Sequence, residues 1–267
     1  MFDDATVRAA AKVAARLNVE PAALLAVAEI ESGGKAFARV NGKNEPLIRF
    51  EGHYFDRRLT AAQRKKARAE GLSSPTAGTV KNPAKQEDRW KLLNRAIAIN
   101  STAALESVSW GLGQVMGSHW KALGYGSVTE MVNECRSSVA GQIEVMARFI
   151  EKNDLSGHLR RKDWAKFARA YNGPGYKQNA YDTKMARAYA KWAKAGVQAA
   201  PPKPAPEPVE PPKPVAPIPV PPEPTVTPTP PAGRAKGIWA LIIAALLGAW
   251  LWIATQSCEW LGLFCGG

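Results

Sequence analysis

Two glutamates, Glu29 and Glu31, lie one residue apart at the end of an apolar run, and the glycines Gly33 and Gly34 follow them. A carboxyl group at the C-terminal end of a helix meets the negative end of the helix dipole, which disfavours its charged form. Burial acts in the same direction and raises the pKa of the group. A glutamic acid that keeps its proton near neutral pH is suited to general acid catalysis, so this segment predicts proton donation to a leaving group.

A second carboxylate stands in RFEGHYF (49–55), where the sequence alternates like a strand. This alternation puts Arg49 and Glu51 on one face, where an ion pair between them would lower the pKa of Glu51 and keep it ionised. One neutral and one ionised carboxyl group are the usual equipment for glycoside cleavage. A catalytic carboxylate and a purely structural ion pair are both open readings of Glu51.

Helical spacing favours Glu31 over Glu29 as the acid. A helix that starts near Pro21 places three apolar residues on one stripe with Glu31: Leu24, Val27 and Ala28. That stripe should face the interior and give Glu31 an apolar backing. Glu29 is then expected to be a solvated charge on the helix face, although Leu25 lies one turn before it.

Two further glycine-rich segments, SWGLGQVMG (109–117) and RAYNGPGY (169–176), have the composition of turns that border a cleft. We expect Gln114 to donate to a substrate bound in this cleft, with a helix-capping amide as the alternative, and Tyr171 and Asn172 to line the cleft. A structural role is expected for Glu106, and a turn or packing role for His53.

Composition restricts the class of protein. The formal charge is +13, and acidic and basic residues balance from position 199 onward, so the whole excess belongs to residues 1–198. Such a domain should associate with polyanions. The three histidines show no paired ligand spacing and there is no C-x-x-C, so we expect neither a metal site nor a cofactor. No nucleic-acid recognition motif is present, so we expect no nucleic-acid partner.

Residues 1–198 are predicted to form one mainly α-helical domain with a small β element at 46–55. A helix should run from Pro21 to a stop at Gly33–Gly34. The other expected helices are 6–17, 86–99, 102–109, 127–135, 141–153, 163–172 and 183–195. The basic segment 56–85 is rich in turn-forming residues, and no helix is assigned to it.

The rest of the chain differs sharply in composition. Residues 201–231 hold 16 of the 21 prolines, so 199–233 should be an extended polyproline II linker. Within 234–267, residues 237–255 carry no charge and are long enough for one transmembrane helix, with tryptophans near its ends. Cys258 and Cys265 follow and would be able to pair in an oxidising space.

Four stretches together identify a resemblance: LLAVAEIESGGKAF, PLIRFEGHYF, RAIAINSTAALESVSWGLGQVMG and LRRKDWAKFARAYNGPGY. Residues from about 15 to 192 resemble the N-acetylmuramidase family of phage endolysins and prophages. The resemblance implies a lysozyme-like fold that cleaves peptidoglycan between N-acetylmuramic acid and N-acetylglucosamine. It implies Glu31 as the catalytic acid and Glu51 as the counterpart of a second acidic position. The C-terminal anchor departs from the usual soluble members.

Other readings stay open at this point. A lytic transglycosylase would use Glu31 as acid and then base and form an anhydro sugar. A protein of another class, an inactive membrane-anchored wall-binding or virion structural protein, would share the basic surface. The N-terminus lacks the features of a secretory signal. Arg234 and Lys236 before the apolar segment favour a cytoplasmic catalytic domain at the inner membrane, unless two basic residues are too few to fix the orientation.

Overall fold

The computed structural model describes residues 2–197. The expected linker at 199–233 and the expected transmembrane helix at 237–255 lie outside the described residues. Within 2–197, no helix combines the length and the apolar character that crossing a bilayer requires.

The described chain is mainly helical, as expected, with two small antiparallel sheets. The α-helices are α1 (Asp4–Leu17), α2 (Pro21–Ser32), α3 (Gly52–Arg58), α4 (Ala61–Ala69), α5 (Gln86–Ile97), α6 (Ser101–Glu106), α7 (Val128–Ser137), α8 (Val139–Lys152), α9 (Ser156–Arg160), α10 (Trp164–Asn172) and α11 (Tyr181–Lys194). Short 3₁₀ turns are η1 (Gly117–His119) and η2 (Pro174–Asn179), and the strands are β1 (Phe37–Val40), β2 (Lys43–Pro46), β3 (Ile48–Phe50), β4 (Val108–Trp110) and β5 (Val115–Met116).

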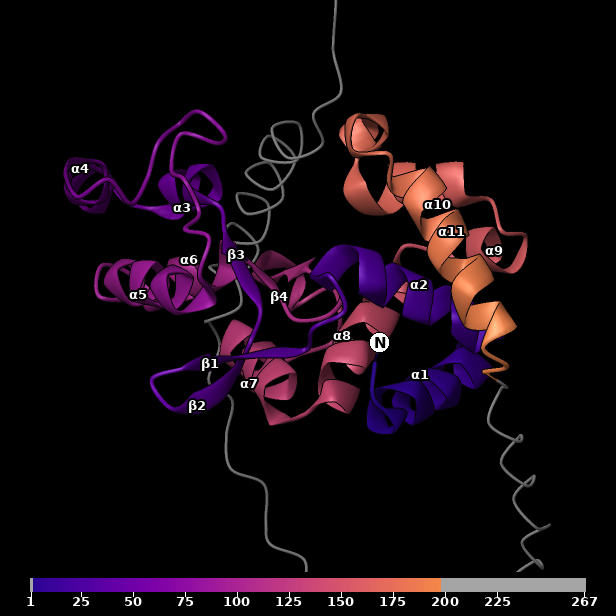
Figure 1. Cartoon of the computed structure of the whole chain (residues 1–267). Coiled ribbons are helices and arrows are strands. Elements are labelled where there is room, and N and C mark those ends of the chain that lie inside the picture. Colours follow the sequence, from indigo (N-terminus) through magenta and orange to yellow (C-terminus); the bar gives the residue numbers. More distant parts are fainter. Residues whose placement is uncertain (1, 198–267) are drawn as a thin grey trace, which may run out of the picture. The chain divides into compact units, whose positions relative to one another are not determined.

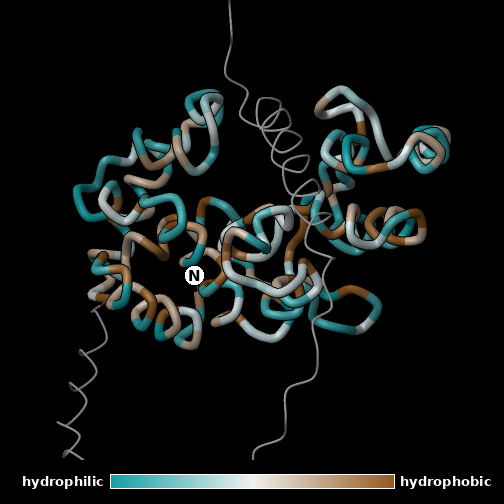
Figure 2. The backbone as a smooth tube through the Cα atoms, turned by 180° about the vertical axis from the view of Figure 1, so that it is seen from behind, coloured by the Kyte–Doolittle hydropathy of each residue, from teal (hydrophilic) through white to brown (hydrophobic). Residues whose placement is uncertain are grey.

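Two hydrophobic cores organise these elements into two lobes. The helical lobe packs α1, α2 and α8–α11 around one core, and the mixed lobe packs the strands with α3–α7 around the other. Helix α8 serves both, since Ile143 belongs to the first core and Val145 to the second. In Figure 1, α2 and α8 lie between the two groups. Figure 2 shows hydrophobic and hydrophilic positions alternating along the helices, as expected for helices with one buried face.

Helix α2 is an exception because water reaches almost none of it. Pro21 occupies its first turn, and every residue from Pro21 to Ala28 is buried. It packs against α1 and α11. Gly33 ends it with a φ of 65°, a left-handed conformation that glycine adopts without a steric penalty. The predicted start and stop are confirmed, and the predicted stripe of Leu24, Val27 and Ala28 is buried; Leu25 and Ala26 are buried as well, so burial extends beyond that stripe.

The sheet of the mixed lobe has the order β3-β4-β5. Phe50 pairs with Val108, and Ile48 pairs with Trp110. The alternation predicted for β3 is confirmed, since Ile48 and Phe50 are buried while Arg49 is exposed. Directly after the strand, the backbone N–H of Glu51 donates to the carbonyl oxygen of Ser107 at 2.8 Å. This bond fixes the start of α3 against the end of α6.

Two predicted boundaries are wrong, and one helix was not predicted. Extended structure in 46–55 stops at Phe50, because α3 begins at Gly52. Segment 56–85 contains α4, which a Thr60–Gln63 capping box starts and which buries one residue, so it carries little hydrophobic periodicity. Helix α6 ends at Glu106, because Val108 and Ser109 pair in the sheet instead.

A buried glutamine joins the lobes behind the site. Gln142 on α8 is 1% exposed, and its Oε1 accepts from the backbone N–H of Leu112 at 2.9 Å. Its Nε2 donates to the carbonyl oxygens of Ala36 and Cys135, each at 3.1 Å. A Cβ at Gly111 would stand 2.9 Å from this side chain, so glycine is needed for the close approach. Gln142 therefore fixes the 111–114 loop and the segment after α2 to one helix.

We predict that Gln142→Leu lowers the free energy of unfolding by about 3 kcal/mol, because one backbone N–H and two carbonyl groups lose their buried partner. Urea unfolding followed by circular dichroism measures this loss. Gln178→Leu, at an exposed position, is the matched control and should change stability by less than about 0.5 kcal/mol. Equal midpoints for the two variants would contradict the role given to Gln142.

Candidate active site

Glu31, the predicted acid, is the next-to-last residue of α2. Its Oε1 accepts a hydrogen bond from Nδ2 of Asn172 at 2.6 Å. Burial raises the pKa of Glu31 to about 7, although the hydrogen bond from Asn172 acts in the opposite direction. The carboxyl group is thus protonated in a substantial fraction of molecules at neutral pH.

Asn172 reaches Glu31 from the end of another helix. It is the last residue of α10, and Gly173 follows with a φ of 84°, in the region that favours glycine. The Oδ1 of Asn172 is buried and has no hydrogen-bond partner within residues 2–197. The structure brings Glu31 and Asn172 into contact across 141 positions of the sequence.

Two tyrosines stand close to the Glu31 carboxyl group. The hydroxyl of Tyr171 donates to the carbonyl oxygen of Gly113 at 2.7 Å, and its ring stacks on Phe167. Burial raises the pKa of Tyr171 and of Tyr181, and the charge of Glu31 raises both further. Both hydroxyls are therefore neutral. Tyr171 links α10 to the 111–114 loop.

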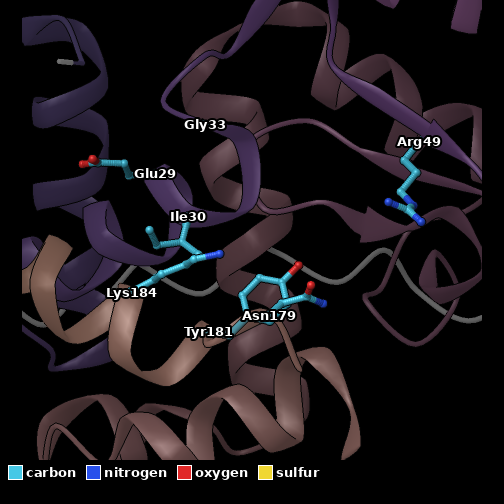
Figure 3. Close-up of a pocket in the computed structure, with 7 residues that line it drawn as sticks. All are labelled: Glu29, Ile30, Gly33, Arg49, Asn179, Tyr181 and Lys184. Atoms are coloured by element: carbon cyan, nitrogen blue, oxygen red, sulfur yellow. The ribbon is translucent and has the colours of Figure 1, made fainter. Parts of the chain in front are cut away.

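The side chain of Glu29 contacts α11 and not Asn172. Its carboxylate accepts from Nζ of Lys191 at 2.6 and 2.7 Å and from Nε1 of Trp192 at 2.6 Å. Figure 3 shows its side chain directed away from Tyr181. The expectation of a solvated charge is wrong, because Glu29 connects α2 to the last turn of α11.

Glu51, the second predicted carboxylate, is the N-cap residue of α3. Nε of Arg49 donates to its Oε1 at 2.7 Å, so the expected pair is present. Nδ1 of His53 lies 3.6 Å from Oε2, and burial lowers the pKa of His53, which favours the neutral imidazole. Glu51 is therefore held beside one permanent cation.

Gln114 and Glu106 are both engaged within the protein. Nε2 of Gln114 donates to the carbonyl oxygens of Gly111 at 2.8 Å and of Leu47 at 3.4 Å, which occupies both amide hydrogens. The substrate-donor role of Gln114 stays a prediction. Glu106 accepts from Arg58 at 3.1 Å and from Trp120 at 2.7 Å, in keeping with a structural role.

An open cavity of about 430 Å³ lies beside the end of α2. Its walls come from α2, from β3 and from the segment where η2 meets α11, with the lining residues Glu29, Ile30, Gly33, Arg49, Asn179, Tyr181 and Lys184. In Figure 3, Arg49 stands across the cavity from the other side chains. Sequence reasoning did not assign Asn179, Tyr181 and Lys184 to the site. The one available signal was their position just after the YNGPGY turn.

Comparisons with known proteins find one matching family model and a similar solved structure. A family model described as N-acetylmuramidase matches residues 20–193. Among solved structures, the crystal structure of the Burkholderia AP3 phage endolysin is 38% identical, with a TM-score of 0.61. The match covers 72% of this chain and 72% of that chain. A search of the curated proteins finds no match.

The raised pKa of Glu31 predicts an effect on stability that is independent of catalysis. The unfolded chain releases this proton near pH 4.5 and the folded chain keeps it until about pH 7, so stability falls as pH rises through this window. Glutamine does not ionise, so the Glu31→Gln variant does not lose stability in this pH window. Between pH 4 and pH 8, Glu31→Gln should therefore gain up to about 3 kcal/mol relative to wild type.

Urea unfolding at the two pH values measures this difference. Glu29→Gln is the control, and it should lose stability at pH 8 because it weakens the contact with Lys191. A Glu31→Gln difference that stays constant from pH 4 to pH 8 would show that Glu31 ionises normally.

Proposed function

The chain belongs to the N-acetylmuramidase family, and from this membership we propose that it cleaves the β-1,4 bond between N-acetylmuramic acid and N-acetylglucosamine, with Glu31 as the general acid. It is a glycosidase, and its likeness to a phage endolysin indicates a peptidoglycan hydrolase of phage lysis. The observation that carries the proposal is the carboxyl group of Glu31, with a pKa of about 7, at the end of a helix whose residues Ile30 and Gly33 line an open cavity.

Proton transfer from Glu31 begins the reaction. The protonated carboxyl group donates to the glycosidic oxygen while the bond from this oxygen to the anomeric carbon breaks. The leaving sugar departs as an alcohol, and positive charge develops on the ring that remains. The pKa of about 7 keeps enough acid protonated at neutral pH for this step.

Glu51 is the second carboxylate of the proposed mechanism. Nε of Arg49 donates to its Oε1, and in the proposed mechanism the Glu51 carboxylate either activates water or stabilises the positively charged ring. Water then completes the hydrolysis at the anomeric carbon. Asn172 orients Glu31, and Tyr171 supports the loop that holds Gln114.

A lytic transglycosylase would break the same bond with Glu31 as acid and then base. This reaction needs only one carboxyl group. The hydrogen bond from Arg49 to Glu51 supports the alternative, because it gives Glu51 a structural role instead of a catalytic one. The mass of the products separates the two reactions, because the anhydro product lacks one water.

The C-terminal segment 237–255 is proposed as a single-pass anchor at the bacterial inner membrane, on the strength of its uncharged sequence alone. In this arrangement the catalytic domain stays cytoplasmic until a membrane lesion exposes the wall. Protease added to intact spheroplasts should leave the domain uncut, and its digestion from outside would rule out this orientation.

The role of Glu31 is tested by zymography on purified cell wall. Glu31→Gln should lower lytic activity by at least about 100-fold, because the amide has no proton to donate. Glu29→Gln is the matched control, two residues away on the same helix, and should stay within about fivefold of wild type. Equal clearing by wild type and Glu31→Gln would refute the assignment. Wild-type protein that clears no bacterial wall would favour the wall-binding alternative.

A further inference from the structure

The cavity at the end of α2 is lined mainly by polar side chains. Four of its lining side chains carry hydrogen-bond donors: Arg49, Asn179, Tyr181 and Lys184. They come from separate parts of the chain, β3 on one side and the η2–α11 junction on the other, and Figure 3 shows them around one opening. Gly33 lines the same cavity two residues after Glu31. Tyr181, which also lines the cavity, lies close enough to Glu31 for the charge of Glu31 to raise its pKa, so a substrate group in this cavity would lie near the proposed acid.

The charges around the cavity are unbalanced. Lys184 forms no ion pair within residues 2–197, and it is exposed. Arg49 uses Nε for Glu51, and its two terminal nitrogens make no hydrogen bond in this part of the chain. Burial lowers the pKa of Arg89, and the positive charge of Arg49 lowers it further. The guanidinium of Arg89 is therefore a second positive charge close to Arg49.

Carboxylates do not offset these cations within the cavity. Glu29 is the one acidic residue among the side chains that line it, and its carboxylate already accepts hydrogen bonds from Lys191 and Trp192. Glu51 balances Arg49, and a protonated Glu31 adds no charge. The positive charge of Lys184 is left for an anionic ligand, with terminal N–H groups of Arg49 opposite it.

Peptidoglycan supplies an anion at this place. Each muramic acid carries a lactyl ether whose carboxyl group is free in stripped glycan strands and bears a peptide with its own carboxylates in the intact wall. We propose that the cavity lined by Arg49, Asn179, Tyr181 and Lys184 is a subsite that binds a carboxylate of this substituent. The inference rests on the proposed muramidase function, and it makes Lys184 a specificity-determining residue.

The subsite gives a physical basis for the choice of bond. Two sugars alternate along the strand, and the lactyl substituent marks one of them. A carboxylate held between Lys184 and Arg49, with donors from Tyr181 and Asn179, would set the register of the strand so that the bond beside Glu31 follows the marked sugar. A neutral strand would gain none of these charge-assisted hydrogen bonds.

The test compares kcat/KM on four substrates at constant ionic strength. Peptide-free and peptide-bearing glycan strands are each used as prepared and after amidation of their carboxyl groups. Wild-type protein should prefer at least one carboxylate form over its amidated partner by about tenfold or more. Lys184→Gln should reduce this preference to about twofold or less. A loss of preference on peptide-free strands would show that the subsite binds the lactyl carboxylate. A loss confined to peptide-bearing strands would show that it binds a carboxylate of the stem peptide.

Lys194→Gln is the control, since it removes the same charge from an exposed position of the same helix, and it should keep the wild-type preference. Equal changes in the two lysine variants would overturn the subsite and leave only a general attraction. Wild-type activity without any preference for carboxylates would also overturn it, with the muramidase function intact. Wild-type protein that cleaves none of the four substrates would instead overturn the proposed function itself.

Discussion

The removal of one carboxyl group from water is the constraint around which this domain is arranged. Glu31 lies in the last turn of a helix that is buried along its first eight residues, and burial is what brings its pKa to about 7. A helix on the surface would leave the same side chain ionised at neutral pH. The enclosure of α2 by its neighbours therefore does more than stabilise the fold, because it sets the protonation state on which the proposed chemistry depends.

A buried acid also needs a fixed orientation, and the structure supplies it from distant segments. Asn172 donates to Glu31 from the end of α10, and Tyr171 next to it is bonded to the 111–114 loop. Gln142 holds the other side of that loop and the segment after α2. Side chains from two helices, α10 and α8, thus act on one short region, so a change at Gln142 reaches the site without touching substrate.

Local features of the site were readable from the sequence, and long-range ones were not. Pro21, the double glycine and the alternation around Arg49 act over a few residues, so the end of α2 and the Arg49–Glu51 pair were predictable. The partners of Glu29 lie 162 and 163 positions away, and no spacing rule reports such a contact. Helix α4 escaped prediction for a related reason, since it buries only Ala67 and thus lacks a hydrophobic stripe.

The contact between Glu29 and α11 has a mechanical meaning. Helix α11 is the last element before the described chain ends at residue 197, and Lys191 and Trp192 in its final turns hold Glu29 by three hydrogen bonds. Trp192 also stacks on Phe2. A pulling force applied to the chain after residue 197 would act on these contacts together. It would be transmitted to α2 at Glu29, two residues before Glu31. These three hydrogen bonds therefore stand between the end of the described chain and the helix that carries the acid.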